Sequence, residues 1–474
     1  MTLQTLKTQI RSRAIDTVIA AFPDPFGRLV GKRFRGDVFL ETVLKHGTHG
    51  CNYLLTVNLE MDPLDGFKVA SWEAGFGDFA FRPDLQTLRP IPWQPGAALV
   101  ICDFVRHDGS LVKEAPRSVL RRQIELLKQQ GFTCGCASEL EFYLFNQTYH
   151  SAFASGYRDL QPASDYRIDY HLLQPTRDEP LMRSVRNGMT AARVPIESSK
   201  GEWSRGQHEI NFSYAQPLAM ADMHVLFKQG IKEIAEQHGK AVSFMAKYAP
   251  GEAGNSCHIH MSLWKGGRNV FWHARGQRAQ VRARRSEGAG PISDLGSPTS
   301  ELGAGSRLFR QFLGGLMKYS PELCLFFAPT INSYKRYQPG SWAPTRMAWA
   351  FDNRTVGFRV VGQNYSFRIE NRMPGADANP YLAFAAMLAA GMAGMQEKLD
   401  CTQEYVGNAY IDLTLPRLPN SLRDAAELFD KSKLARAAFG SDIVEFYVHH
   451  ARLEIEAFNN AVTDWEKIRY FERI

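Results

Sequence analysis

Charged and apolar residues alternate over one short stretch, Ser138 to Phe145, and this pattern predicts a strand. Every second side chain of a strand points to the same face, so Glu139 and Glu141 lie on one face roughly 7 Å apart. From Phe142 onward both faces are apolar, which indicates a strand that is covered on both sides. Buried carboxylates need cations, and Mg2+ or Mn2+ take oxygen ligands. The alternative at this point is a pair of solvated glutamates.

Three later segments repeat this period of two. Each places polar side chains on one predicted strand face: Gln207 and Glu209, then His258, His260 and Ser262, then Arg368, Glu370 and Arg372. A loop before the first of them delivers Glu202. Guanidinium groups fit carboxylate and phosphate oxygens, so the third face suits an anion. The alternatives are core histidines on the second face and a surface ion-pair ladder on the third.

Helical periodicity and turn residues divide the chain into two domains. Pro116 and Gly131 bound a predicted helix over 117–130. Further helices are predicted at 1–15, 220–239, 307–319, 381–398, 422–439 and 443–471. A turn at 24–28 begins a predicted hairpin, and 97–102 reads as a buried strand. We place the boundary after the turn Asp108-Gly109, which gives an N-terminal domain of residues 1–110 and a larger domain of residues 111–474.

Composition indicates a globular protein of enzyme size. The chain has 474 residues, of which 44% are hydrophobic, so full cores can form. It contains no apolar run of a membrane-spanning length, and its polar N-terminus lacks a signal peptide pattern. We therefore expect a cytoplasmic protein. Its seven cysteines are scattered, and we expect free thiols.

The charge balance is basic, with a net charge of +7. Five arginines contribute to one cluster: Arg275, Arg278, Arg282, Arg284 and Arg285. They lie in a segment, 267–305, that we interpret as a solvated surface insertion of unassigned role. No nucleic-acid motif is found, so we expect small-molecule substrates, and neither nucleic acid nor membrane as a partner.

Five separated motifs, taken together and in order, resemble the glutamine synthetase superfamily. They are Glu139-x-Glu141, Glu202-x6-Glu209, His258-x-His260, Asn332-Ser333-Tyr334-Lys335-Arg336, and Arg368-x-Glu370-x-Arg372. Each motif is weak alone, and the resemblance extends from Asp24 to Glu466. It implies an α+β fold: an N-terminal β-grasp domain preceded by a helix or arm, and a large domain whose antiparallel strands form a funnel flanked by helices. It also implies a homo-oligomer of two stacked six-membered rings, a dodecamer, in which each active site lies between one subunit's large domain and a neighbour's small domain.

The resemblance also implies the site residues. The ligands of two or more Mg2+ or Mn2+ ions would be Glu141, Glu202 and Glu209 at one position and Glu139, His258 and Glu370 at another. Catalytic groups at the transferred phosphoryl would be His260, Arg354 and Arg359. ATP would contact Glu197, His260, Ser262 and Arg368, and glutamate would contact Glu141, Gly254, Arg336 and Arg372.

The reaction that follows is an ATP-dependent carbon-nitrogen ligation. A carboxylate is a poor electrophile, so glutamate first accepts the γ-phosphoryl group of ATP while cations and arginines neutralise the phosphate charge. An uncharged amine then attacks γ-glutamyl phosphate and forms the γ-glutamyl amide, provided that water is excluded.

The residues around the expected amine site depart from the ammonia-using members. Their flap carries a glutamate, whereas Pro339-Gly340-Ser341-Trp342-Ala343-Pro344 has Trp342 at that position. An N-terminal aspartate of those members is also missing near Val69-Ala70-Ser71-Trp72, and their lysine five residues before the metal glutamate is Tyr365. We therefore expect an apolar amine pocket with Trp342, Trp72 and Trp203, and an apolar or aromatic substrate such as isopropylamine or aniline, which would yield γ-glutamylanilide, in amine catabolism.

Several alternatives stay open at this point. Ethanolamine is a second candidate amine, and ammonia would make the protein an ordinary glutamine synthetase. An inactive structural or regulatory relative is a third alternative. Trp342 could simply pack the flap shut, and we expect Tyr410, near an adenylylated tyrosine of some relatives, to serve packing.

Overall fold

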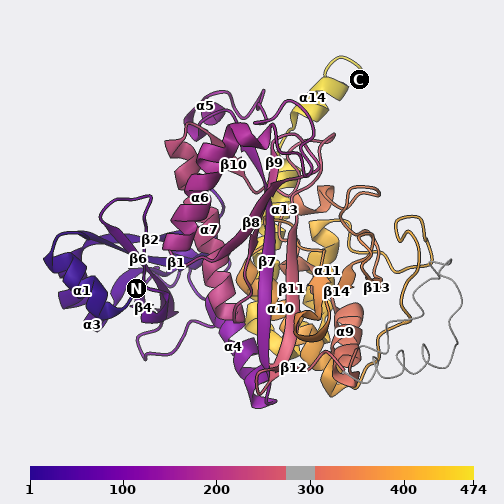
Figure 1. Ribbon diagram of the computed structural model, residues 1–474, viewed down its shortest axis with the longest axis horizontal. Helices are drawn as coiled ribbons and strands as arrows, with labels where there is room; N and C mark the ends of the chain where they lie inside the picture. The colour runs from indigo at the N-terminus through magenta and orange to yellow at the C-terminus, as the bar shows by residue number, and fades with distance from the viewer. Residues whose placement is uncertain (274–304) are drawn as a thin grey trace, which may run out of the picture.

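The computed structural model describes residues 1–273 and 305–474, which form a small sheet near the N-terminus and a large sheet covered by helices (Figure 1). The arginine cluster between residues 275 and 285 lies outside the described residues. This arrangement is the predicted α+β fold, with an N-terminal mixed sheet and a large sheet flanked by helices.

The N-terminal sheet has the strand order β2-β1-β6-β4-β3, and β5 pairs with β6. Its strands are β1 (Thr17–Pro23), β2 (Leu29–Arg35), β3 (Thr48–Cys51), β4 (Asp78–Pro83), β5 (Arg89–Pro90) and β6 (Ala97–Val105). The predicted turn at Asp24 joins β1 and β2 into a hairpin, and β6, buried over its whole length, pairs with β1 in parallel. Three short helices accompany this sheet: α1 (Leu3–Arg11), α2 (Gly36–Val38) and α3 (Leu44–His46).

The large sheet has the order β13-β14-β15-β11-β7-β9-β8, with β10 on β7 and β12 on β11. Its strands are β7 (Thr133–Phe145), β8 (Ile196–Gly201), β9 (Gln207–Phe212), β10 (Ala241–Ser243), β11 (Cys257–Lys265), β12 (Arg268–Asn269), β13 (Trp349–Phe351), β14 (Phe358–Val361) and β15 (Arg368–Asn371). The pairings are antiparallel except β13 with β14. β7 runs through the middle, and its residues from Phe142 to Phe145 are buried on both faces, as predicted.

The helices pack around this sheet (Figure 1). They are α4 (Pro116–Gln129), α5 (Tyr149–Ala154), α6 (Glu179–Ala191), α7 (Pro217–Gln237), α9 (Arg307–Tyr319), α10 (Pro380–Gln396), α11 (Leu422–Lys431), α12 (Lys433–Phe439), α13 (Ser441–Asn460) and α14 (Asp464–Tyr470). α10 is buried from Pro380 to Gly394 and is apolar all round, as a central helix must be. Gly315 of α9 faces it so closely that a β-carbon there would lie 2.1 Å from the Ala390 carbonyl oxygen. No helix in the described ranges is long and apolar enough to cross a membrane.

Two long helices predicted near the C-terminus are each interrupted, which corrects the sequence-based expectation. The 422–439 segment breaks at Ser432, whose side chain caps α12 by accepting a hydrogen bond from the Ala435 N–H group. The 443–471 segment breaks before Thr463, which forms a capping box with Glu466 at the start of α14. In both cases a side-chain cap starts a new helix where the apolar periodicity alone continues.

A buried ion network joins the two parts of the molecule. Arg117 of α4 contacts Asp222 of α7 at 2.9 Å and Asp84 of the N-terminal part at 2.7 Å, and it also pairs with Asp103 on β6. Tyr381 of α10 donates to Asp222 at 2.6 Å. The predicted boundary near residue 110 falls between β6 and α4, beside this network, and remains a prediction.

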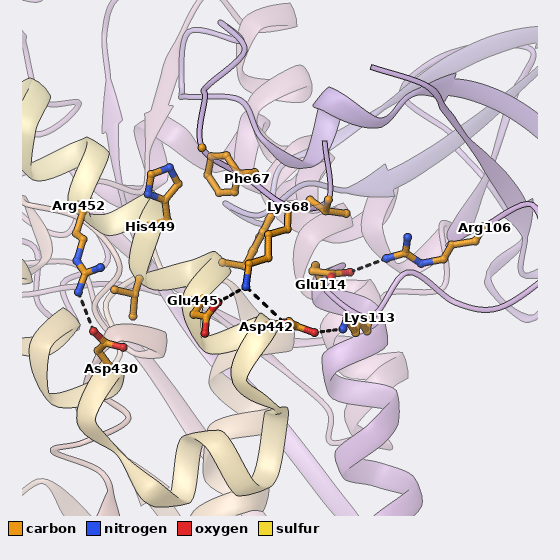
Figure 2. Close-up of a pocket in the computed structure, with 14 residues that line it drawn as sticks. Phe67, Lys68, Arg106, Lys113, Glu114, Asp430, Asp442, Glu445, His449 and Arg452 are labelled. Atoms are coloured by element: carbon orange, nitrogen blue, oxygen red, sulfur yellow. Dashed lines mark hydrogen bonds and ion pairs between the residues drawn. The ribbon is translucent and has the colours of Figure 1, made fainter. Parts of the chain in front are cut away.

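A second contact between the two parts is a polar cleft of about 390 Å³ (Figure 2). There Lys68 lies 2.7 Å from Glu445 and 4.0 Å from Asp442, and Lys113 also pairs with Asp442. Phe67 packs on His449 of α13 beside these charges. The N-terminal part is thus held to the C-terminal helices by exposed ion pairs and one buried aromatic side chain.

All seven cysteines are free thiols, as expected.

Candidate active site

Strand register brings the predicted acidic and histidine residues onto one region of the large sheet. Glu141 of β7 lies opposite Glu209 of β9, and Glu139 lies opposite His258 of β11. On the next strand, Glu370 of β15 lies opposite His260. The period of two within each strand therefore places residues from four strands side by side.

Glu139, His258 and Glu370 form the first group that could hold a metal, with ligand atoms within 4.8 Å of one another. His258 Nδ1 lies 3.3 Å from Glu139 and 3.7 Å from Glu370. Burial alone would raise the pKa of Glu139, but His260 and His258 outweigh it and lower that pKa. Arg372 and the histidines likewise outweigh burial at Glu370, whose pKa falls to about 2. Both carboxylates are therefore ionised and ready to bind a cation.

Glu141, Glu209 and His258 form the second such group. Burial and the nearby Glu202 carboxylate raise the pKa of Glu209 to about 9 and that of Glu141 to about 7. Glu202 lies outside this group, because its carboxylate pairs with Lys200. These raised pKa values mean that the crowded, buried carboxylates have too little positive charge near them to stay ionised. A divalent cation would supply that charge, and it prefers oxygen ligands such as these carboxylates.

Arginines predicted to meet phosphate surround the first group. Arg359 of β14 lies 2.9 Å from Glu370 and 3.0 Å from Asp352, and Arg372 pairs with the other Glu370 oxygen. Arg368 donates to Nδ1 of His260 at 3.0 Å, and this orients the ring toward Glu139. These contacts concentrate positive charge at one end of the carboxylate row.

Three other predicted groups are spread over the same region. Arg354 lies on an exposed turn after β13, and its charge reaches Asp169. Glu197 is exposed on β8. Ser262 is buried on β11 and accepts from Trp264 Nε1 at 2.9 Å, and Trp264 stacks on Tyr214 at 6.2 Å between ring centroids. The stacked rings of Trp264 and Tyr214 were not predicted from the sequence, and they offer a flat apolar surface beside Ser262.

The predicted glutamate-binding residues meet around Arg336. Arg336 is 1% exposed and donates to the Met373 carbonyl and to Ser256, each at 2.8 Å. Its Nε atom and that of Arg372 are buried without a hydrogen-bond partner among the described residues, which suits an incoming carboxylate. Gly254 lies against Arg336, and a β-carbon there would lie 2.5 Å from its Cγ atom.

Two of the three predicted amine-pocket tryptophans are in contact. The rings of Trp203 and Trp342 lie edge to face with centroids 5.7 Å apart, and Trp203 directly follows Glu202. Trp342 has a positive φ of 64°, a strained conformation for a large side chain, and Arg372 donates to its carbonyl oxygen at 3.3 Å. Trp72 is elsewhere within the chain: it is 65% exposed in the N-terminal part and packs on Phe76. A single chain therefore joins two tryptophans and leaves the third on another surface.

Lys200, for which no role was predicted, and Gln207 also shape this region. Lys200 pairs with Glu202 and lies 3.9 Å from Glu209, so it partly neutralises the second group. Gln207, predicted on the face of Glu209, donates to Glu141 at 3.3 Å and to the Gly254 carbonyl at 3.1 Å. The only sequence signal for Lys200 is its place two residues before Glu202. The Tyr410 hydroxyl is buried, which agrees with the expected packing role.

The chain is similar to known proteins over almost its whole length. The family described as "Glutamine synthetase, catalytic domain" matches residues 113–297 and 293–470. The chain is 47% identical over 473 residues to the γ-glutamylethanolamide synthetase GlnA4 of Streptomyces coelicolor, covering 100% of this chain and 96% of the relative. It is 36% identical to a glutamate-isopropylamine ligase of a Pseudomonas species, covering 98% and 97%. The solved structure of the GmaS/ADP complex in conformation 1 superposes with a TM-score of 0.80 at 25% identity, covering 98% and 99%.

Proposed function

Because the chain belongs to the glutamine synthetase family and is an ATP-dependent ligase that joins glutamate to an amine, we propose that its amine is a small primary monoamine with an apolar or aromatic tail, such as isopropylamine or aniline. The observation that carries this proposal is the Trp203–Trp342 pair beside Glu202. An apolar tail gains free energy when it is buried against such a surface, whereas ammonia has no tail to bury.

The first step activates glutamate. Its γ-carboxylate oxygen attacks the γ-phosphorus of ATP, ADP leaves, and γ-glutamyl phosphate forms. We assign Arg336, Arg372, Gly254 and Glu141 to glutamate and Glu197, His260, Ser262 and Arg368 to the nucleotide. His260, Arg354 and Arg359 are assigned to the charge that develops on the transferred phosphoryl group.

The family uses a divalent metal, and the two carboxylate groups described above are its candidate sites. A bound Mg2+ or Mn2+ ion would be held by Glu139, His258 and Glu370 at one position and by Glu141, Glu202 and Glu209 at the other. When bound, such an ion supplies positive charge to the phosphate oxygens. In this proposal Lys200 must release Glu202 before that carboxylate can bind a cation.

The second step is attack by the amine nitrogen on the acyl phosphate, with loss of inorganic phosphate. Only an uncharged nitrogen has the lone pair that this step needs. The flap offers Trp342 where a base would otherwise stand, so an amine that arrives largely neutral, such as aniline, suits it best. Isopropylamine must lose its proton first, and we assign this proton to Glu202, whose carboxylate accepts a hydrogen bond from the Trp203 backbone N–H group at 3.2 Å.

Ethanolamine is the second candidate, because the relative at 47% identity is a γ-glutamylethanolamide synthetase. Its short tail ends in a hydroxyl group, which needs a hydrogen-bond partner rather than an indole ring.

A role in amine catabolism and a dodecamer of two stacked rings belong to the same proposal. In such a ring the neighbour's Trp72 would complete the pocket that one chain leaves open.

The test is glutamate-dependent release of phosphate from ATP with a panel of ammonia, ethanolamine, isopropylamine, aniline and putrescine, with products identified by mass. We expect the highest kcat/KM for isopropylamine or aniline. Trp342→Glu should lower kcat/KM for these amines by about tenfold or more, because burying a charge beside an apolar tail is unfavourable. Trp342→Phe, the matched control, should keep most of the activity. A preference for ammonia in the unmodified enzyme would contradict the proposed amine.

A further inference from the structure

The segment between α5 and α6 contacts the β8–β9 hairpin. The Tyr170 N–H group donates to the Gly201 carbonyl at 3.3 Å, and Ile168 is fully buried against the same glycine. Lys200 lies over the Tyr170 ring, 4.6 Å from its centroid. These contacts fix residues 166–171 beside Glu202 and Trp203.

Arg167 is the residue of this loop that reaches the tryptophan pair. Its Cζ atom lies 4.4 Å from the centroid of the Trp203 ring, whose edge meets Trp342. Within the described part of the chain, no carboxylate lies within 4.0 Å of its guanidinium group. Asp169, two residues on, instead interacts with Glu202, Lys200 and Arg354. The positive charge of Arg167 is therefore held on the indole and is not cancelled by a salt bridge.

We propose that Arg167 is a specificity-determining residue that keeps a positive charge at the edge of the amine site and thereby excludes amines carrying a second ammonium group. The inference rests on the proposed placement of the amine beside Trp203 and Trp342. A monoamine presents an uncharged tail to this edge, whereas the second ammonium group of a diamine meets a like charge there, which is unfavourable even though Arg167 is exposed. The guanidinium also fixes the Trp203 ring, so it acts on specificity through both charge and position.

The experiment compares kcat/KM for isopropylamine and for putrescine in the full-length enzyme and its variants. We expect Arg167→Glu to raise the ratio of kcat/KM for putrescine to kcat/KM for isopropylamine by about tenfold or more. Arg167→Gln should raise this ratio by less. Arg167→Lys should leave the ratio within about twofold, because the charge is kept. Added salt should shrink the difference between the unmodified enzyme and Arg167→Glu, since the site is partly open to solvent.

The matched control is Arg177→Gln. Arg177 follows in the same segment, is 63% exposed at its side chain and pairs with Asp165 at 2.8 Å. In the Arg177→Gln variant the ratio of kcat/KM for putrescine to kcat/KM for isopropylamine should equal that of the unmodified enzyme. Equal losses for both amines in Arg167→Glu and Arg167→Gln, with an unchanged ratio, would show that Arg167 only packs and would overturn this inference alone. An unmodified enzyme that uses none of the amines would overturn the proposed function together with it.

Discussion

Carboxylates in the candidate site differ in protonation although they lie on neighbouring strand positions. The pKa of Glu139 and Glu370 is lowered because histidines and arginines outweigh burial. The pKa of Glu141 and Glu209 is raised because burial and other carboxylates act in the same direction. One half of the site is therefore ionised at neutral pH, and the other half holds protons until a cation replaces them.

This difference predicts that Mn2+ binding releases protons. Between pH 7 and pH 9 the empty site holds the Glu209 proton, and below pH 7 it also holds the Glu141 proton. The apparent affinity for Mn2+ should therefore rise by about tenfold per pH unit between pH 7 and pH 9 and level off above pH 9. Titration calorimetry in buffers of different ionisation enthalpy measures the number of protons released.

Glu209→Gln provides the control for the calorimetry. The amide cannot hold the proton, so this variant should bind Mn2+ more weakly and with a much flatter pH dependence from pH 7 to pH 9. Metal binding to the unmodified protein at pH 8 without any proton release would show that Glu209 is already ionised in the empty site.

At the scale of elements, the β8–β9 hairpin depends on a glycine next to Glu202. A β-carbon at Gly201 would lie 2.4 Å from the Ile168 carbonyl oxygen, so the loop over 166–171 can approach only a glycine. We expect Gly201→Ala to push this loop outward and to lower kcat/KM for the amine by about tenfold, because reacting groups lose their alignment. Hydrogen exchange should show faster exchange in residues 164–174.

Gly251→Ala is the matched control for that substitution, since a β-carbon at Gly251 meets nothing within 4 Å. It should leave both the exchange of residues 164–174 and the amine kinetics unchanged. Unaltered exchange in Gly201→Ala would mean that the hairpin, and not the loop, absorbs the added methyl group.

The elements with a regular period were the ones that the sequence predicted. Polar residues recur at every second position in β11, in β15 and in β7 from Ser138 to Phe142, so their polar faces could be assigned from the sequence. The loop that delivers Glu202 was predicted, but β8 before it was not, because its residues 197–200 are all polar and show no alternation. The helix breaks at Ser432 and before Thr463 were missed, because a cap is a local side-chain hydrogen bond and leaves no mark on the apolar period.

Some residues of the candidate site could likewise be predicted from the sequence and others could not. Its carboxylates and histidines could be named from motifs, because the strand period and the residue types identify them. Contacts between loops could not: the stacking of Arg167 on Trp203 and the pairing of Lys200 with Glu202 depend on how separate loops meet in space. Trp72 shows the limit most directly, because its place relative to the other tryptophans depends on how whole domains are arranged.

For the whole molecule, Arg117 is the main ionic connection between the N-terminal sheet and the helices. It is 2% exposed and contacts three aspartates, so its loss would leave several buried negative charges without a partner. We expect Arg117→Ala to destabilise the protein by about 3–5 kcal/mol. The measurement is the midpoint of urea unfolding, followed by both tryptophan fluorescence and circular dichroism.

Arg122→Ala is the control on the same helix, because Arg122 is exposed. The free energy of unfolding obtained from its urea midpoint should differ from that of the unmodified protein by no more than about 0.5 kcal/mol. Equal midpoints for the two variants would mean that neighbouring Arg121, which lies 2.8 Å from Asp84 and 3.1 Å from Asp103, is sufficient to neutralise this network.

The central place of β7 in the large sheet has a consequence for the chain as it leaves the ribosome. β7 ends at Phe145, but its partners β9, β10 and β11 begin at Gln207, Ala241 and Cys257, and β15 begins only at Arg368. At a synthesis rate of about 5–20 residues per second, roughly 10 to 45 seconds separate β7 from β15. During this time a long apolar strand has open edges and Glu370 does not yet exist. The open edges of this strand make the nascent chain prone to aggregation. The metal group of Glu139, His258 and Glu370 cannot form until translation has passed residue 370, whereas the group of Glu141, Glu209 and His258 can form earlier.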